Sequence, residues 1–187
     1  MIINLTGAHG VGKTTVARRI SSLFPEIHLV EEFAYKDTGF DTSQKEGFLR
    51  NEEIYFTEKK EKYSEAIRFE GITLFVRGME DLLYYISAFP GDNGYSWKID
   101  GDFEYLTNEI SGYKSDLIIF LDADRTTIEK RCMNDIVKKR ELVEGWYEKK
   151  YKPFRDYILQ HNYAMCIDTT SKSIEDVVQN ITALLKQ

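Results

Sequence analysis

Short apolar runs along the chain alternate with longer segments in which apolar residues recur at helical spacing. The runs predict strands over residues 2–6, 27–30, 72–76, 117–121 and 164–167. The longer segments predict helices over residues 14–24, 43–69, 79–89, 102–113, 138–160 and from Ile174 onwards. Strands separated by helices pair in parallel, because a crossover helix returns the chain to the same end of the sheet. The pattern predicts an α/β fold: a three-layer α/β/α sandwich around a five-stranded parallel sheet.

Turn and capping residues delimit these elements. The stretch 90–101 contains three glycines and several Asp and Asn residues, which is typical of a loop. Thr126 stands three residues before Glu129, the spacing of a capping box at the start of a helix. Ser173 is expected to cap the last helix. Because no internal repeat or linker divides the sequence, residues 1–187 are expected to form a single domain.

Charge and composition narrow the range of partners. The chain has 31 Asp and Glu residues against 25 Lys and Arg, a net charge of −6 that disfavours a general nucleic-acid-binding protein. The longest apolar run, residues 117–121, is far shorter than the roughly 20 residues that cross a bilayer. The first residues contain no basic leader, so a cytoplasmic location without a membrane partner is expected. Cys132 and Cys166 lie outside any paired motif, which predicts neither a zinc site nor a disulfide.

The clearest chemical motif lies between the first predicted strand and the first predicted helix. It fits the pattern G-x-x-x-x-G-K-[ST], with the residues Gly7, Ala8, His9, Gly10, Val11, Gly12, Lys13 and Thr14. Such a loop wraps backbone N–H groups around a phosphate, and glycines are needed where a Cβ would collide. Lys13 is expected to reach the β- and γ-phosphates, and the Thr14 hydroxyl to ligate Mg²⁺. The loop and Thr15 after it are predicted to bind the nucleotide.

With this loop and this order of elements, the chain resembles the P-loop nucleoside and nucleotide kinases, in particular their deoxynucleoside kinase and thymidylate kinase branch. Residues 151–158 are similar to the uridine kinases. The resemblance covers nearly the whole chain, and the loop is its most specific part. It implies an enzyme that uses ATP and Mg²⁺ to phosphorylate a hydroxyl or phosphate of a small acceptor, with a nucleoside or nucleotide favoured.

The resemblance places a glutamate directly after the second strand, where Glu31 and Glu32 stand in this chain. Glu31 is the expected catalytic base, because a carboxylate near the acceptor hydroxyl can orient it and take its proton. The family usually has proline next, so with Glu32 there it stays open which carboxylate faces the acceptor. Both could also simply face water. The expected substrate contacts are Glu32, Phe33, Phe48, Tyr55 and Asp81.

A second match follows the third strand, where this branch has an acidic residue and an arginine before a helix. Arg77 fits the arginine, and beside a transferring phosphoryl group it would offset charge in the transition state. Val76 stands in place of the acidic residue. Either Mg²⁺ is then held by Thr14, the nucleotide phosphates and Glu31 or Asp81, or activity is weak or lost.

Residues 125–150 correspond to the basic lid that these kinases close over the phosphates. The cationic residues of this stretch include Arg125, Arg131, Lys138, Lys139 and Arg140. By the resemblance, Arg131 contacts the nucleotide and assists catalysis. The alternative is a basic helix face that is only solvated.

Two other functions compete with a nucleoside or nucleotide kinase. Because fold and loop do not choose the acceptor, a kinase of another hydroxyl compound, such as a cofactor precursor or an antibiotic, is one of them. A nucleotide-binding regulatory ATPase is the other. The lid favours transfer to a small acceptor, and the sequence contains no guanine-reading Asn-Lys-x-Asp motif. The predicted helix over residues 43–69 could pair with its copy to form a homodimer.

Overall fold

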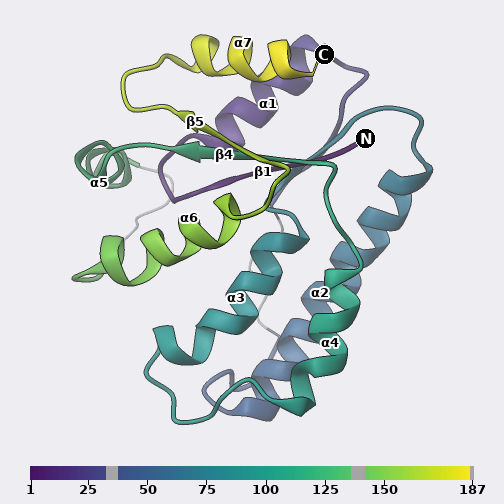
Figure 1. Ribbon diagram of the computed structural model, residues 1–187, viewed down its shortest axis with the longest axis vertical. Helices are drawn as coiled ribbons and strands as arrows, with labels where there is room; N and C mark the ends of the chain where they lie inside the picture. Colours follow the sequence, from purple (N-terminus) through teal and green to yellow (C-terminus); the bar gives the residue numbers. More distant parts are fainter. Residues whose placement is uncertain (33–37, 136–141, 186–187) are drawn as a thin grey trace.

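The computed structural model describes residues 1–32, 38–135 and 142–185 (Figure 1). In this part of the chain the strands form one parallel sheet in the order β2-β3-β1-β4-β5. They are β1 (Ile2–Gly7), β2 (His28–Val30), β3 (Thr73–Val76), β4 (Leu117–Asp122) and β5 (Ala164–Asp168). The predicted five-stranded parallel sheet is confirmed, and β1 lies at its centre.

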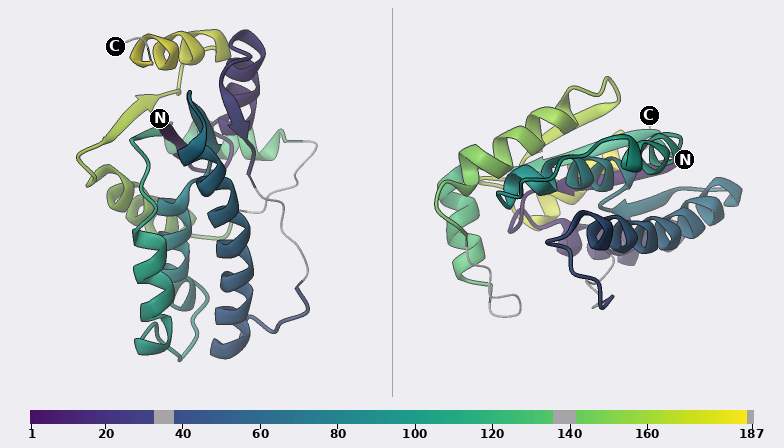
Figure 2. Two further views of the ribbon diagram at one scale, coloured as in Figure 1. Left: turned by 90° about the vertical axis from the view of Figure 1, so that its right-hand side faces the viewer. Right: turned by 90° about the horizontal axis from the view of Figure 1, so that it is seen from below.

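Helices cover both faces of the sheet, which confirms the predicted three layers (Figures 1 and 2). One face carries α1 (Lys13–Leu23) and α7 (Ile174–Leu184). The other face carries α3 (Met79–Asp92) and α6 (Lys152–Leu159). Beside α3, the helices α2 (Lys45–Arg68) and α4 (Gly101–Ser111) extend past the sheet. The remaining helices are α5 (Arg125–Met133) and the π-helical η1 (Tyr147–Tyr151). None of the described helices is long and apolar enough to span a membrane.

The central strand β1 directs alternate side chains to opposite faces of the sheet. Ile3 and Leu5 have no exposed surface and belong to the hydrophobic core on the α1 and α7 side. On the α3 side, Asn4 and Thr6 are equally buried although they are polar. Buried polar groups need hydrogen-bond partners, so this face of β1 must meet polar groups from a neighbouring element.

A second hydrophobic core lies between α2, α3 and α4. Phe48 of α2 is fully buried there and stacks on Phe89, with 4.2 Å between the ring centroids. Trp97 and Phe103 contact the same ring. Aromatic rings bury a large apolar area at a few positions, which lets these helices pack together beyond the edge of the sheet. Phe48, expected as a substrate contact, is therefore a core residue.

Among the helix boundaries that differ from those predicted, three have a clear structural cause. α3 continues through Pro90 to Asp92, because Pro90 is buried in the last turn, where a missing N–H costs only one helical bond. α5 is capped by Asp124, whose side chain accepts from the Thr127 N–H, and not by Thr126. In the described part of the chain, the helix predicted over residues 138–160 begins only after Gly145. Gly145 has a φ of +75°, which is incompatible with a right-handed helix. The Ser173 cap of α7 is confirmed.

We expect Phe48→Ala to lower the free energy of unfolding by about 3–5 kcal/mol, since it removes a buried ring and leaves a cavity. Urea denaturation measures this change. Ile67→Ala, at a side chain of the same helix that is 66% exposed, is the matched control and should change stability by no more than about 0.5 kcal/mol. Equal effects of the two substitutions would contradict the position of Phe48 in the core.

Candidate active site

The glycine-rich loop joins the end of β1 to the start of α1. Gly7, Gly10 and Gly12 have positive φ angles of +137°, +75° and +98°. A Cβ on Gly7 would lie 2.2 Å from the carbonyl oxygen of Leu121, so only glycine lets the loop pass this close to β4. Gly12 directly precedes α1, so the loop opens at a helix N-terminus, where backbone N–H groups favour an anion.

The other residues of the loop divide between core and solvent. The Nζ atom of Lys13 donates to the carbonyl oxygens of Gly7, at 3.0 Å, and Ala8, at 2.7 Å, so the side chain spans the two ends of the loop. Val11 is buried in the core and fixes the middle of the loop. Thr14 is half-buried in the first turn of α1. The exposed residues are His9 and Thr15.

Helix α5 packs on this loop and brings Arg131 beside it. A Cβ on Gly10 would lie 2.9 Å from Cys132 Sγ and 3.4 Å from Arg131 Cβ. The Arg131 guanidinium donates to the hydroxyl of Thr169, at 3.0 Å, and to its carbonyl oxygen, at 2.7 Å. The expected lid arginine is therefore docked on the turn after β5, next to the loop.

Of the other expected lid cations, only Arg125 lies in the described part of the chain. Arg125 is exposed and forms an ion pair with Glu129 one turn along α5, at 2.8 Å. Lys138, Lys139 and Arg140 lie outside the described residues.

Arg77 occupies the turn between β3 and α3. Among the described residues it is the only non-glycine residue with a positive φ, of +65°. Its guanidinium forms ion pairs with Glu32, at 2.6 Å, and with Asp81, at 3.3 Å. Val76 stands where the kinases that this sequence resembles have an acidic residue, and it is buried in the core. Glu32 and Asp81 thus supply the acidic partners of this arginine from two other elements.

The first turn of α3 carries two buried carboxylates that meet the polar face of β1. Asp81 accepts hydrogen bonds from Asn4 Nδ2, at 2.9 Å, from the Thr6 hydroxyl and from the Gly78 N–H. Glu80 accepts from Asn4 Nδ2 at 2.9 Å and from the N–H and hydroxyl of Ser115. Carboxylates at this end also suit the helix dipole. Asp81, expected to contact substrate, is a buried anchor of α3 and a partner of Arg77.

The two glutamates after β2 have different partners. Glu31 forms a bidentate pair with Arg18 of α1, with both N–O distances 2.7 Å, on the exposed surface. Glu32 reaches Arg77 instead. Of the aromatic residues expected near the substrate, Tyr55 is half-buried on α2, and Phe33 lies outside the described residues. Of the two glutamates after β2, Glu32 is therefore the one whose carboxylate contacts Arg77.

Two ionisable side chains of α2, those of Glu52 and Lys59, are buried. Glu52 is 2% exposed, and burial raises the pKa of its carboxyl to about 7, against the opposing effects of the Asn51 amide and the Lys59 charge. Lys59 is 8% exposed, and burial lowers the pKa of its ammonium to about 8. The Asp81, Glu32 and Glu80 carboxylates limit that decrease, while the Arg77 charge adds to it.

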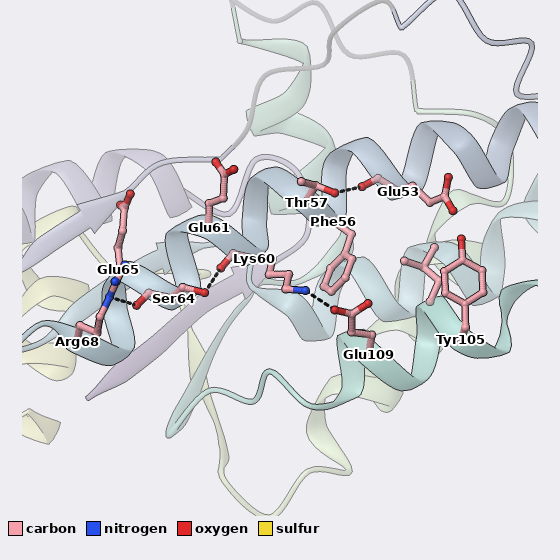
Figure 3. Close-up of a pocket in the computed structure, with 11 residues that line it drawn as sticks. Glu53, Phe56, Thr57, Lys60, Glu61, Ser64, Glu65, Arg68, Tyr105 and Glu109 are labelled. Carbon is pink, nitrogen blue, oxygen red and sulfur yellow. Dashed lines mark hydrogen bonds and ion pairs between the residues drawn. The ribbon is translucent and has the colours of Figure 1, made fainter.

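A groove of about 770 Å³ lies elsewhere, between α2 and α4 (Figure 3). An ion pair between Lys60 and Glu109 crosses it, and its other polar residues include Glu53, Glu61 and Arg68. None of the expected site residues within the described part of the chain lines it. The groove is therefore separate from the glycine loop and from the turn that carries Arg77.

The protein side chains alone offer little to a metal ion. Within residues 1–32, 38–135 and 142–185, no group of three or more His, Cys, Asp and Glu side chains is arranged to hold one. The Thr14 hydroxyl stands at the start of α1, beside the loop. Such a donor set fits Mg²⁺, which typically keeps several waters and binds through substrate phosphates with one or two protein ligands.

Asn4, Thr6 and Lys59 were not identified from the sequence. Two polar residues in an otherwise apolar strand, Asn4 and Thr6, are a signal that could have revealed the polar face of β1. Lys59 gives no such signal, because α2 is rich in lysine and glutamate and its sequence does not show which of them is buried.

Comparison with known proteins finds likeness in structure only. No family model matches the sequence, and neither does any curated protein. A deoxyadenosine kinase from M. mycoides with bound dATP superposes with a TM-score of 0.69 at 17% identity, covering 100% of both chains.

Two further structures share the fold. A thymidylate kinase from Candida albicans has a TM-score of 0.59 at 16% identity, covering 99% of this chain and 90% of that one. The YorR protein from Bacillus subtilis, in complex with phosphorylated GDP, has a TM-score of 0.62 at 16% identity, covering 100% of this chain and 96% of that one. The chain therefore has the fold of the P-loop nucleoside and nucleotide kinases, as the sequence resemblance predicted.

Proposed function

We propose that this protein is a kinase that transfers the γ-phosphate of ATP to a hydroxyl or phosphate of a nucleoside or nucleotide. The observation that carries the proposal is the glycine loop between β1 and α1, which is spanned by Lys13 and ends at a helix N-terminus. Deoxyadenosine kinase and thymidylate kinase share the fold, which supports this class of acceptor.

On the donor side, the loop N–H groups would bind the phosphates of ATP, and Lys13 would leave the loop carbonyls to contact the β- and γ-phosphates. Arg131 stands beside Gly10 and would contact the same phosphates. Thr14 would ligate Mg²⁺, which would neutralise charge on the phosphate oxygens when bound with the nucleotide. Residues 125–150 would cover this site as a lid, within a single domain.

On the acceptor side, Arg77 would stabilise the charge of the transferring phosphoryl group. We assign the role of base to Glu32, because its carboxylate lies 2.6 Å from Arg77 whereas Glu31 pairs with Arg18. With a hydroxyl acceptor, its oxygen would form a bond to the γ-phosphorus while the bond from that phosphorus to the ADP oxygen breaks, and the hydroxyl proton would pass to the Glu32 carboxylate. The acceptor would lie between Glu32 and α2, on the side of Tyr55.

Lys13→Ala should remove nucleotide binding or lower kcat by about 100-fold or more, since it deletes the cation of the loop. ATP binding by calorimetry and ADP release with a panel of nucleosides and monophosphates measure this. Arg19→Ala, on the exposed side of α1, is the matched control and should behave as wild type. A wild-type protein whose ADP release no acceptor stimulates would refute the proposed kinase.

Glu32→Gln should lower kcat by roughly 100-fold, the usual range for a general base, because the amide cannot take the proton. Glu31→Gln is the matched control, and it should keep most of the activity because its carboxylate faces Arg18. Steady-state kinetics of both variants decide the assignment. A larger loss with Glu31→Gln would return the role of base to that residue.

Glu52→Gln should make stability less dependent on pH. The folded pKa of Glu52, about 7, lies above the unfolded value of 4.5, so its contribution to stability is full below pH 4.5 and is lost as pH rises through 7. Relative to Glu52→Gln, the wild type should lose about 3 kcal/mol between pH 4.5 and 8. Urea denaturation across this range measures the difference. Glu61→Gln, at an exposed site of α2, should follow the wild type, and parallel curves for all three proteins would contradict the prediction.

A further inference from the structure

Lys59 makes an unusual contact for a lysine in the middle of a helix. Its Nζ atom donates to two successive backbone carbonyls, those of Arg77 and Gly78, each at 2.9 Å. The side chain is buried, and it reaches from α2 to the turn between β3 and α3. One ammonium group therefore ties α2 to the turn that presents Arg77.

This turn has a backbone conformation that its sequence does not favour. Arg77 lies in the left-handed region, where a residue with a Cβ is strained and persists only if surrounding contacts hold it. The next residue must be glycine, because a Cβ at position 78 would lie 2.7 Å from Asn4 and from the Tyr63 hydroxyl. The turn thus depends on its neighbours for its shape.

Those neighbours hold the two sides of the turn differently. Buried side chains bind its N–H groups: Asn4 Oδ1 accepts from the Gly78 N–H at 2.8 Å, and the Tyr63 hydroxyl accepts from the Met79 N–H at 3.1 Å. The carbonyl groups of residues 77 and 78 are bound by Lys59. The carboxylates of Asp81, Glu32 and Glu80 favour a positive charge at this position, whereas the Arg77 guanidinium opposes it.

A buried lysine that only filled space would destabilise the fold relative to an apolar side chain. Burial disfavours its charged form and lowers the pKa of Lys59 to about 8, and an apolar side chain of similar length would avoid that penalty. What an apolar side chain lacks is the ability to bind both carbonyl oxygens. The two hydrogen bonds to the turn are therefore the feature that distinguishes lysine here.

We propose that Lys59 is a positioning residue, which holds the turn after β3 in its left-handed conformation and so keeps the Arg77 guanidinium at the phosphoryl-transfer site. This inference rests on the proposed function. Lys59 acts through Arg77 and needs no contact with either substrate. The conformation that it stabilises also keeps the pair between Arg77 and Glu32 in place.

Lys59→Met tests the proposal through kinetics. Because a misplaced catalytic group typically costs about 100-fold in rate, kcat should fall roughly 10- to 100-fold with the KM for ATP little changed. Lys62→Met, at a lysine one turn later whose side chain is 43% exposed, is the matched control and should leave kcat at the wild-type value. In an Arg77→Gln background, Lys59→Met should cause no further loss, since the two residues act as a unit. A full additional loss there would overturn the proposal.

A crystal structure of Lys59→Met tests the same proposal without any activity. Residue 77 should leave the left-handed region, or its guanidinium should separate from Glu32. An unchanged turn overturns the positioning role, whatever the kinetics. If the wild type phosphorylates no acceptor, the proposed function fails, and this structure still decides what Lys59 does.

Circular dichroism shows first whether the variant folds. If Lys59→Met does not, Lys59→Gln replaces it in every arm, because its shorter neutral amide keeps a donor and weakens both hydrogen bonds. Failure of both variants to fold would overturn the proposal, since a lysine with a purely structural role gives that result.

Discussion

The candidate site depends on the hydrogen bonds and the ion pair made by the buried carboxylate of Asp81. It joins the central strand, the turn after β3 and the start of α3, through hydrogen bonds from Asn4, Thr6 and Gly78 and an ion pair with Arg77. Breaking such a buried charged network by removing one partner costs several kcal/mol, because the remaining groups stay unpaired. This carboxylate therefore fixes the start of α3 and the turn that carries Arg77 relative to the central strand.

The elements around this anchor store unfavourable free energy. Arg77 is strained, and burial shifts the pKa values of Lys59 and Glu52 in the direction that disfavours their charged forms. Groups of this kind cluster at functional sites, where a well-packed surrounding structure holds them. The aromatic core around Phe48 supplies that packing for α2, the helix that carries both of these buried ionisable side chains. The site and the second core are thus parts of one arrangement.

The fold shows how the positive charges of this acidic chain are distributed. A net charge of −6 describes the whole surface, whereas Lys13 and Arg131 converge on one loop at the carboxyl end of the central strands, where Arg77 also stands. These cations are paired with carbonyl oxygens and carboxylates in this structure. An anionic ligand would have to compete with those partners, so binding and rearrangement of side chains would be coupled.

Local sequence determined the strands, their parallel pairing, the three layers and the glycine loop, because apolar periodicity and glycine spacing act over a few residues. It could not determine which of Glu31 and Glu32 turns toward Arg77, since adjacent residues at a strand end point in different directions and only the neighbouring elements select between them. It also left hidden that Asp81 is an anchor, that Phe48 is core and that Lys59 is buried. Those roles follow from contacts between residues far apart in the chain, such as Asn4 with Asp81, which only the tertiary structure brings together.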